Sequence, residues 1–191
     1  IVVSADGLHD ADIEKVVRSH FESGCIATMA IVGIDHEEVS KYGVVVPSEN
    51  HTVLEFQEKP SLDEAKSNFI NTGIYVFNKR IFDFIPEGQK YDFARDVFPS
   101  LLEAGEKINT YRIYSYWSDI GTIDQYIQSN KDALNRKVMT PEPNIMRKYE
   151  AVYSVGHNCK IDKSIKFVNN VIIGNNCKIG KNLDVIILTA Y

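Results

Sequence analysis

The sequence predicts an α/β domain followed by a parallel β-helix, and two patterns predict this fold class. From Ile1 to Asn135, short apolar runs rich in Val and Ile alternate with segments of helical periodicity, as in layered α/β domains. From Val155 onward, apolar residues recur every six positions, which is typical of a β-helix. The composition, 44% hydrophobic and 25% charged over 191 residues, is that of a globular protein with one large domain or two small ones.

In the α/β part, hydrophobic periodicity and capping residues place the elements. We expect strands at 1–3, 25–34, 43–47, 52–58, 69–77 and 109–117, and helices at 13–21, 36–41, 79–85, 93–104 and 123–135. Asp12 can cap the first helix, and Gly24 can end it. Pro99 should kink or split the helix at 93–104, because proline lacks the N–H that a helix interior needs. Thr122 can cap the last of these helices.

Residues 137–153 differ from the segments on either side. They contain Pro141 and Pro143 and little periodicity, and we interpret them as a linker between a first domain, 1–136, and a second, 154–191.

The second domain carries a repeat of six residues. One apolar column is Val155, Ile161, Phe167, Ile173, Ile179 and Val185, and a second is Cys159, Ile165, Val171, Cys177, Leu183 and Thr189. A third phase holds Asn158, Asn170, Asn176 and Asn182, and asparagine tolerates the left-handed backbone of a corner. Three hexads make one coil of a parallel β-helix, so the sequence predicts two coils, with Cys159 and Cys177 as core thiols. Chance spacing in a Val- and Ile-rich tail is the alternative.

Charge and cysteine content exclude several classes of partner. The net charge is −5 without a dense basic run, which argues against nucleic acid. The longest apolar stretch, 26–34, is too short to span a bilayer. Three cysteines without a CxxC motif argue against a disulfide framework or a zinc knuckle. We therefore expect a cytoplasmic protein with no nucleic-acid or membrane partner.

Both ends of the chain lie in apolar strands. The chain opens at Ile1 without a Met and stops just after the run that ends at Leu188. Because stable domains rarely leave such strands bare, we expect a fragment of a longer polypeptide.

Two carboxylates follow predicted strands. Asp6 comes after the first strand, and Asp119 comes after the aromatic strand that ends at Trp117. Ligands of open α/β sheets lie at such strand ends, and two carboxylates that meet there could bind Mg²⁺. The alternative is that each is a turn or helix-entry aspartate.

A second group of polar residues lies on the central strands. Glu58 continues the face of Leu54 and Phe56 by period two, so its carboxylate needs a partner or a ligand; an exposed ion pair at the strand end is the alternative. Asn71 and the nearby Gly73 suit close approach by a polyol, although a simple β-bulge would also explain them.

Several motifs in order resemble the sugar-1-phosphate nucleotidyltransferases, also called nucleoside-diphosphate-sugar pyrophosphorylases. They are VVSAD at 2–6, YGVV at 42–45, FQEKP at 56–60, NTGIYVF at 71–77 and YWSDIGT at 116–122. Within the family the sequence most resembles mannose-1-phosphate guanylyltransferases, through YDFARDVFP at 91–99 and the segment 124–135. The resemblance implies a Rossmann-like mixed sheet with helices on both faces, of which 1–136 is the sugar-phosphate half, and a left-handed β-helix after it.

The resemblance also implies roles for individual residues. Asp6 and Asp119 would hold the catalytic Mg²⁺, and Lys59 would pair with the sugar phosphate. Glu58 would accept hydrogen bonds from sugar hydroxyls. The remaining pocket residues would be Gly43, Asn71 and Gly73.

The implied reaction joins mannose 1-phosphate to GTP. An oxygen of the sugar phosphate attacks the α-phosphorus in line and pyrophosphate leaves, without a protein nucleophile, so catalysis comes from positioning and charge neutralisation. Glucose-1-phosphate adenylyl-, uridylyl- or thymidylyltransferase activity is the alternative within the family.

This chain departs from the family pattern in two places. Ser4 and Ala5 stand where the family has Asn-Gly, and the Gly-rich loop that grips the triphosphate would lie upstream of Ile1. A non-catalytic regulatory subunit that senses sugar phosphate is therefore a second hypothesis. A β-helix acyltransferase is a third, for which His157 is the only histidine in the repeat. We expect the β-helix to join subunits into a homo-oligomer.

Overall fold

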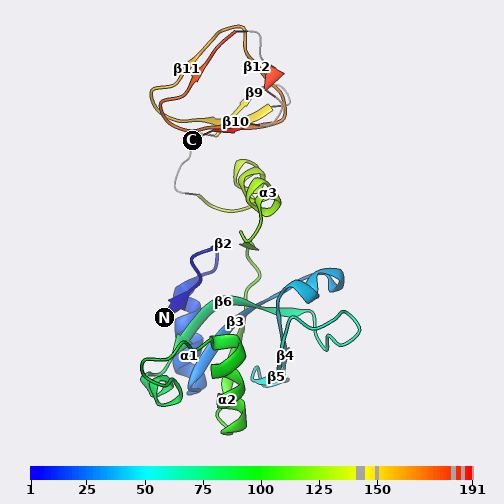
Figure 1. Cartoon of the computed structure of the whole chain (residues 1–191), viewed down its shortest axis with the longest axis vertical. Coiled ribbons are helices and arrows are strands. Elements are labelled where there is room, and N and C mark those ends of the chain that lie inside the picture. Colours follow the sequence, from blue (N-terminus) through cyan, green and yellow to red (C-terminus); the bar gives the residue numbers. More distant parts are fainter. Residues whose placement is uncertain (141–144, 149–150, 182–183, 186–187, 191) are drawn as a thin grey trace. The chain divides into compact units, whose positions relative to one another are not determined.

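The computed structural model describes residues 1–140, 145–148, 151–181, 184–185 and 188–190. The chain forms two compact units, Ile1–Trp117 and Ser118–Tyr191, and each is described by itself (Figure 1).

A mixed sheet forms the centre of the first unit, as predicted. Its strands are β1 (Val2–Val3), β3 (Ala27–Gly33), β4 (Gly43–Pro47), β5 (Val53–Glu58), β6 (Phe69–Phe77) and β7 (Ile108–Arg112). Their order is β5-β4-β6-β3-β7, with β1 beside β6. Only β3 and β7 pair in parallel, and the other pairs are antiparallel. A short strand, β2 (Gly7–His9), lies outside this sheet.

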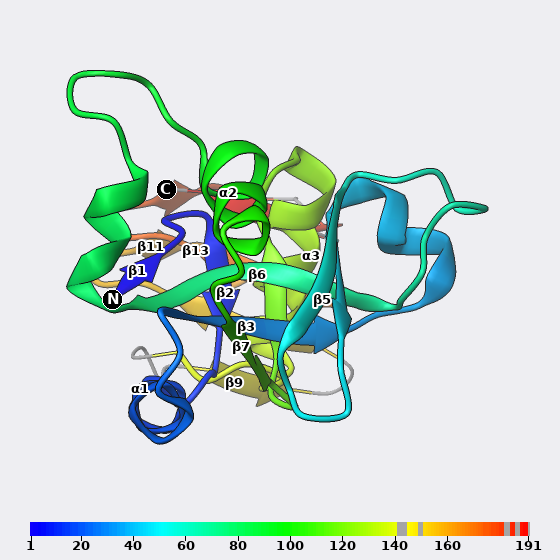
Figure 2. The same ribbon diagram turned by 90° about the horizontal axis from the view of Figure 1, so that it is seen from below.

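Helices cover both faces of the sheet, which confirms the layered arrangement. α1 (Ile13–Ser23) packs Val16 against Ala30 and Ile74 on one face, and α2 (Phe98–Glu103) packs against Met29 and Ile31 on the other. Figure 2 shows α1 and α2 on opposite sides of β3 and β6. Two 3₁₀ helices, His36–Lys41 and Lys79–Phe84, and a π-helical turn, Phe93–Val97, complete the unit.

The predicted helix ends are confirmed. The Asp12 side chain accepts a hydrogen bond from the Lys15 N–H at the start of α1, and Gly24 ends the helix with a left-handed φ of 62°. The segment 93–104 is split into the π-helical turn and α2, with Pro99 in the first turn of α2. Proline is accepted there because the first N–H groups of a helix have no intrahelical partner.

One predicted strand is wrong in extent. The strand expected at 109–117 ends at Arg112, and Trp117 begins a separate strand, β8 (Trp117–Asp119). β7 lies at the edge of the sheet, where its pairing with β3 ends at Ile31 opposite Arg112. Beyond that pair β3 continues to Gly33 and stays paired with β6, but the residues after Arg112 leave the ladder, so no pairing holds their alternating side chains extended.

In the second unit, α3 (Ile123–Leu134) begins at Thr122, whose side chain accepts a hydrogen bond from the Gln125 N–H as predicted. β9 (Ile145–Lys148) and β10 (Ala151–Val155) then form an antiparallel pair. The predicted linker, 137–153, therefore contains regular structure, because cross-strand pairing supplies order that its irregular hydrophobic pattern did not signal. The two compact units also divide at Trp117, before the predicted boundary.

The following strands pair in parallel at a constant offset. They are β11 (Lys160–Ile161), β12 (Lys166–Phe167), β13 (Asn170–Ile173), β14 (Lys178–Ile179), β15 (Asp184–Val185) and β16 (Leu188–Ala190). Lys160 pairs with Lys178 and Phe167 with Val185, each eighteen residues on, and β13 pairs with β10 and β16. In Figure 1, β10, β11 and β12 lie on three sides of one coil. Eighteen residues are three hexads, which is the neighbour relation that the repeat predicts.

The two apolar columns form the core of these coils. Val171 and Ile173 are buried, and the other column residues that contact them are Val155, Cys159, Ile161, Ile165, Phe167, Cys177 and Ile179. Leu183 and the side chains of Val185 and Thr189 lie outside the described residues. All three cysteines of the chain are free thiols.

Two of the predicted asparagine corners are confirmed. Asn158 and Asn176 have φ values of 57° and 61°. The third left-handed corner is Asn169, with φ of 62°, and not Asn170, which begins β13. Asn182 lies outside the described residues.

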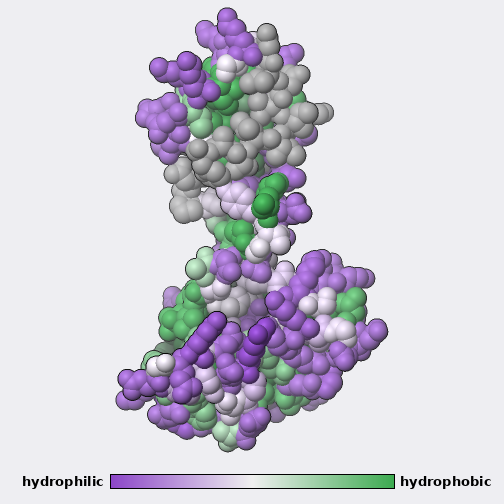
Figure 3. All heavy atoms as spheres, viewed as in Figure 1, coloured by the Kyte–Doolittle hydropathy of each residue, from purple (hydrophilic) through white to green (hydrophobic). Residues whose placement is uncertain are grey.

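Within the described ranges, no helix has the length and apolar character needed to cross a membrane. Hydrophilic residues cover much of the face of the first unit that Figure 3 shows.

Candidate functional site

Three of the predicted site residues lie in one row across the sheet. Glu58 on β5 is paired with Gly43 on β4. Val44 is paired with Ile70 on β6, and the same register continued by one residue places Asn71 beside Gly43. Paired residues project to the same face, with about 4.8 Å between neighbouring strands. The sheet therefore brings together Glu58, Gly43 and Asn71, which are distant in sequence.

Gly43 leaves room in this row for larger neighbours. A Cβ atom at Gly43 would lie 2.6 Å from the Phe56 ring and 3.1 Å from a Glu58 carboxylate oxygen. The first distance is below any normal contact, so a side chain here would displace both groups. The absent side chain allows the exposed Glu58 carboxylate to lie over the β4 backbone.

The Asn71–Gly73 segment forms a β-bulge, the alternative that its sequence allowed. The pairing of β3 with β6 shifts register between Met29 and Ile31. Gly73 takes a left-handed φ of 76°. The Asn71 side-chain oxygen accepts a hydrogen bond of 3.1 Å from the Gly73 N–H, and the Thr72 hydroxyl donates one of 2.8 Å to the Ala30 carbonyl. A bulge re-aims side chains locally, so this one is compatible with a site as well as with a structural role.

The bulge also holds the segment that carries Asp6. The Ser4 N–H donates a 2.9 Å hydrogen bond to the Gly73 carbonyl, and a Cβ atom at Gly73 would lie 2.8 Å from that of Ser4. The Ser4 hydroxyl in turn donates to the exposed Asp6 carboxylate. Gly73 is therefore required for close packing of this segment, which is a more specific role than general access to the pocket.

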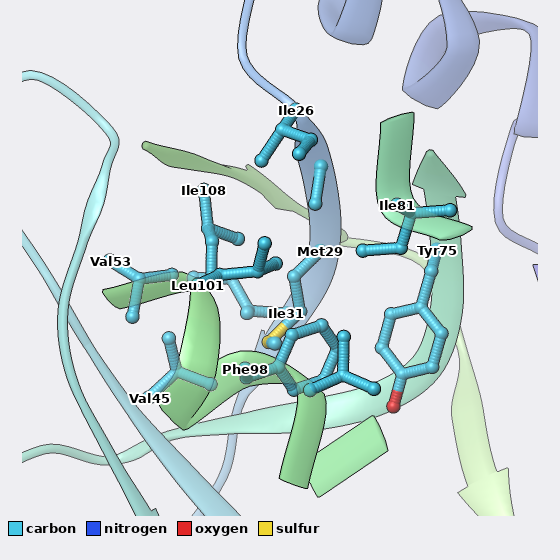
Figure 4. Close-up of a cluster of buried hydrophobic side chains, with 12 residues drawn as sticks. Ile26, Met29, Ile31, Val45, Val53, Tyr75, Ile81, Phe98, Leu101 and Ile108 are labelled. Carbon is cyan, nitrogen blue, oxygen red and sulfur yellow. The ribbon is translucent and has the colours of Figure 1, made fainter. Parts of the chain in front are cut away.

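Tyr75 joins the row through Asn71, although sequence reasoning assigned it no role. The Asn71 amide donates a 2.6 Å hydrogen bond to the Tyr75 hydroxyl, whose own proton remains available to a ligand. The centroids of the Tyr75 and Phe98 rings are 5.2 Å apart, and Figure 4 shows both side chains in the same buried cluster. Burial raises the pKa of Tyr75 to about 12, and the negative charges of Asp92 and Glu58 act in the same direction. The phenol is therefore neutral and can donate at physiological pH.

Asp92 is a second residue that sequence reasoning did not select. Its carboxylate caps the π-helical turn by accepting hydrogen bonds of 2.9 Å from the N–H groups of Ala94 and Arg95. It is close enough to Tyr75 to influence that phenol electrostatically. Both residues can be identified only from the folded structure. The bulge aligns Asn71 with Tyr75, and the chain folds back so that Asp92 lies near Tyr75.

Lys59 follows the row directly. It has a left-handed φ of 48°, and its N–H donates a 3.2 Å hydrogen bond to the Tyr42 carbonyl. The side chain is exposed and makes no ion pair with any described residue. Its ammonium group is therefore free to meet an anion.

Asp119 lies in the second unit and is half-buried beside Gly121, where a Cβ atom would lie 3.4 Å from its carboxylate. Because Asp6 belongs to the first unit, a shared metal ion remains a prediction. No cluster of three or more His, Cys, Asp or Glu side chains suited to a metal occurs in the described ranges. Two carboxylates with substrate phosphates nevertheless suit Mg²⁺, which commonly binds in this way.

Comparison with known proteins gives consistent results. Residues 1–136 match the family described as Nucleotidyl transferase. A UTP–glucose-1-phosphate uridylyltransferase from Synechocystis sp. is 41% identical over 138 residues, covering 72% of this chain and 36% of the relative. A glucose-1-phosphate adenylyltransferase from Clostridium novyi is 33% identical over 162 residues, covering 82% and 41%. The chain thus spans well under half the length of these curated relatives.

A solved structure shows the same fold. A candidate glucose-1-phosphate thymidylyltransferase from Bacillus anthracis, crystallised with sucrose, superposes with a TM-score of 0.59 at 22% identity, covering 73% of this chain and 55% of the other. All three similar proteins are named for glucose 1-phosphate. The finer likeness to mannose-1-phosphate guanylyltransferases is therefore not confirmed.

Proposed function

Since the chain belongs to the nucleotidyl transferase family, we propose that it carries the sugar-phosphate half of a sugar-1-phosphate nucleotidyltransferase. One observation carries this proposal. The sheet register aligns Glu58, Gly43 and Asn71 on one face, and Asn71 binds a neutral Tyr75 phenol beside them. An acceptor carboxylate and a donor phenol on one surface suit a polyol, because each sugar hydroxyl both donates and accepts.

In this proposal the sugar is glucose, and the nucleotide is UTP or ATP. The support is that the similar uridylyl- and adenylyltransferases are named for glucose 1-phosphate. Mannose 1-phosphate with GTP, the pair that the sequence motifs suggested, is the alternative that the experiment below measures.

Each group in the row has a distinct task. Glu58 accepts hydrogen bonds from sugar hydroxyls, and Tyr75 donates one. Asn71 orients Tyr75 through their 2.6 Å hydrogen bond. Gly43 leaves space for the sugar next to β4, since a side chain at this position would displace the Glu58 carboxylate. Gly73 holds the bulge that presents these groups.

The reaction is transfer of a nucleotidyl group. An oxygen of the sugar 1-phosphate forms a bond to the α-phosphorus, the bond from that phosphorus to the bridging oxygen breaks, and pyrophosphate leaves with the electron pair. Lys59 offsets the repulsion between the two anionic substrates, which is an electrostatic contribution of about 3 kcal/mol in closed sites. Asp6 and Asp119 would hold Mg²⁺, whose chemistry when bound is charge neutralisation of the phosphates.

The C-terminal coils have a structural task in the same proposal. Their eighteen-residue parallel pairings support a left-handed β-helix that joins subunits into a homo-oligomer. The free state of all three cysteines supports a cytoplasmic location, where thiols stay reduced.

A thermal-shift screen of sugar 1-phosphates with Mg²⁺ tests the proposal. Saturating glucose 1-phosphate should raise the melting temperature by about 2–4 °C, the shift expected for ligand stabilisation of a protein of this size. Mannose 1-phosphate should give a smaller shift. A larger shift with mannose 1-phosphate would reverse the sugar assignment, and no shift with any hexose 1-phosphate would contradict the proposed function.

A further inference from the structure

A groove of about 610 Å³ lies in the first unit, around the ends of β3 and β7 and the start of β6. It is lined by Gly33, Ile34, Asp35, Glu38, Asn68, Phe69 and Arg112. Its size is within the range of small-molecule sites. Arg112 is opposite Ile31, and Ile31 is opposite Asn71. Arg112 therefore lies two strand spacings, about 10 Å, from Asn71, with the buried Ile31 between them. Phe69, which also lines the groove, is two residues from Asn71 on β6, so the groove adjoins the candidate sugar-phosphate residues.

Aromatic rings hold the cation of this groove in place. The Arg112 guanidinium lies 4.8 Å from the centroid of the Phe69 ring and 4.7 Å from that of Tyr114. A guanidinium stacked on rings keeps its edge donors free. Within the described part of the chain, Arg112 makes no hydrogen bond or ion pair through its side chain. The structure thus presents a planar, oriented and unused set of N–H donors.

Acceptors complete the groove. Asp35 is exposed, and its side chain does not cap the 3₁₀ helix that follows it. Glu38, by contrast, is paired with Lys41 at 2.7 Å. The Asn68 oxygen is held by the His36 ring at 3.0 Å, which leaves the amide N–H₂ of Asn68 to donate. The groove therefore offers one cation, one carboxylate and one amide.

The balance of these charges selects the ligand. A phosphate or other anion would be repelled by Asp35, and a metal ion would be repelled by Arg112. A neutral polyol satisfies both kinds of group, because each hydroxyl accepts from the guanidinium or donates to the carboxylate. Beside the lining residues, the Tyr114 ring contacts the Arg112 guanidinium, and its side chain is 82% exposed. It offers an apolar surface to the C–H groups of a pyranose bound at Arg112.

We propose that this groove is a carbohydrate-binding site for a neutral sugar, centred on Arg112 and beside Glu58, Gly43 and Asn71. The inference does not rest on the proposed function, because it uses none of those three residues. The open groove and the absence of a charged anchor on the ligand imply weak binding, with a Kd of about 1 mM or higher.

Calorimetric titration with maltose tests the site. Wild-type protein should bind with a saturable isotherm. Arg112→Gln and Tyr114→Ala should each raise the Kd at least about tenfold, because the first removes the donor set and the second removes the ring surface. Asp35→Asn keeps the size of the side chain and should weaken binding by removing the charged acceptor. Circular dichroism should be unchanged, since Arg112, Tyr114 and Asp35 are exposed.

Two controls separate this site from the proposed active site. Arg18→Gln makes the same change at another exposed arginine, which pairs with Glu14, and should bind maltose like wild type. Glu58→Gln should also leave maltose binding intact. Loss of maltose binding in Glu58→Gln with retention in Arg112→Gln would overturn the inference. So would the absence of saturable binding, or Arg112-dependent binding of glycine instead of maltose.

Discussion

The sheet of the first unit and the coils of the second bury apolar residues by different rules. In the sheet, the core joins residues far apart in sequence, such as Met29 with Phe98. In the coils, apolar residues occupy the same two positions of every hexad, so Val171 and Ile173 pack against residues of the same two columns in the neighbouring coil. The sheet buries several polar side chains, including Thr28, Thr72, Asn109 and Thr110, whereas residues 151–181, all of them described, bury none.

This difference shows where a binding site can form. The coils repeat the same strand pairing every eighteen residues, so each coil resembles the next. The sheet is interrupted at Gly73, and the interruption brings Asn71 to the Tyr75 hydroxyl. The candidate site is therefore built at a local departure from regular pairing, while the regular region serves packing.

The largest predicted effect distinguishes the two regions by stability. Ile173→Ala should cost about 2–5 kcal/mol, because it leaves a cavity at a fully buried position. In a repeat architecture a loss of stability is confined to the altered coil and its neighbours. Hydrogen exchange should therefore accelerate in β10 and β13 and remain slow in β3 and β6. Equal acceleration in all four strands would show that the two regions unfold as one.

A smaller effect tests the bulge. Gly73→Ala should cost about 2–3 kcal/mol, since alanine is strained at a φ of 76° and its Cβ would overlap Ser4. Gly88→Ala is the matched control, with φ of 72° and no atom within 4 Å, and should cost only about 1 kcal/mol. Chemical denaturation measures both. Equal losses would mean that the contact with Ser4 does not matter.

The smallest effect concerns the buried polar residues of the sheet unit. Burial lowers the pKa of His20 from its ordinary value near 6.5, so the unfolded chain binds the proton more readily. Stability should be complete above about pH 6.5 and decline as the pH falls below it. His20→Asn should flatten this dependence in denaturation measured from about pH 7.5 to 5, the range in which histidine titrates.

Much of the fold could be predicted from hydrophobic period and capping chemistry. The β6 strand, the Asp12 cap and the eighteen-residue spacing of the coils all depend on local pattern. The early end of β7 depends instead on where its pairing with β3 stops. Asn169 replaces Asn170 at a corner because the turn is one residue earlier than the hexad phase implied. Local sequence does not encode either.

The candidate site was predicted in part for the same reason. Glu58 and Asn71 carried signals of their own: a carboxylate on an apolar face, and an amide near a glycine. Gly43 was implied only by the resemblance to the family. In the sequence Tyr75 resembled an ordinary core aromatic residue, because its hydroxyl meets the Asn71 amide only through the bulge. Asp92 was noticed only within the family motif at 91–99, and its capping of the π-helical turn gave no signal of a site.

The central claim is that the row across β5, β4 and β6 binds the sugar of a sugar 1-phosphate. Its most direct test is calorimetric titration of glucose 1-phosphate into wild type, Glu58→Gln and Glu55→Gln. Glu55 is on the same strand but pairs with Lys66 outside the row. Glu58→Gln should raise the Kd at least about tenfold, the loss expected when a charged acceptor is removed, and Glu55→Gln should bind like wild type. Unchanged affinity in Glu58→Gln would contradict the claim.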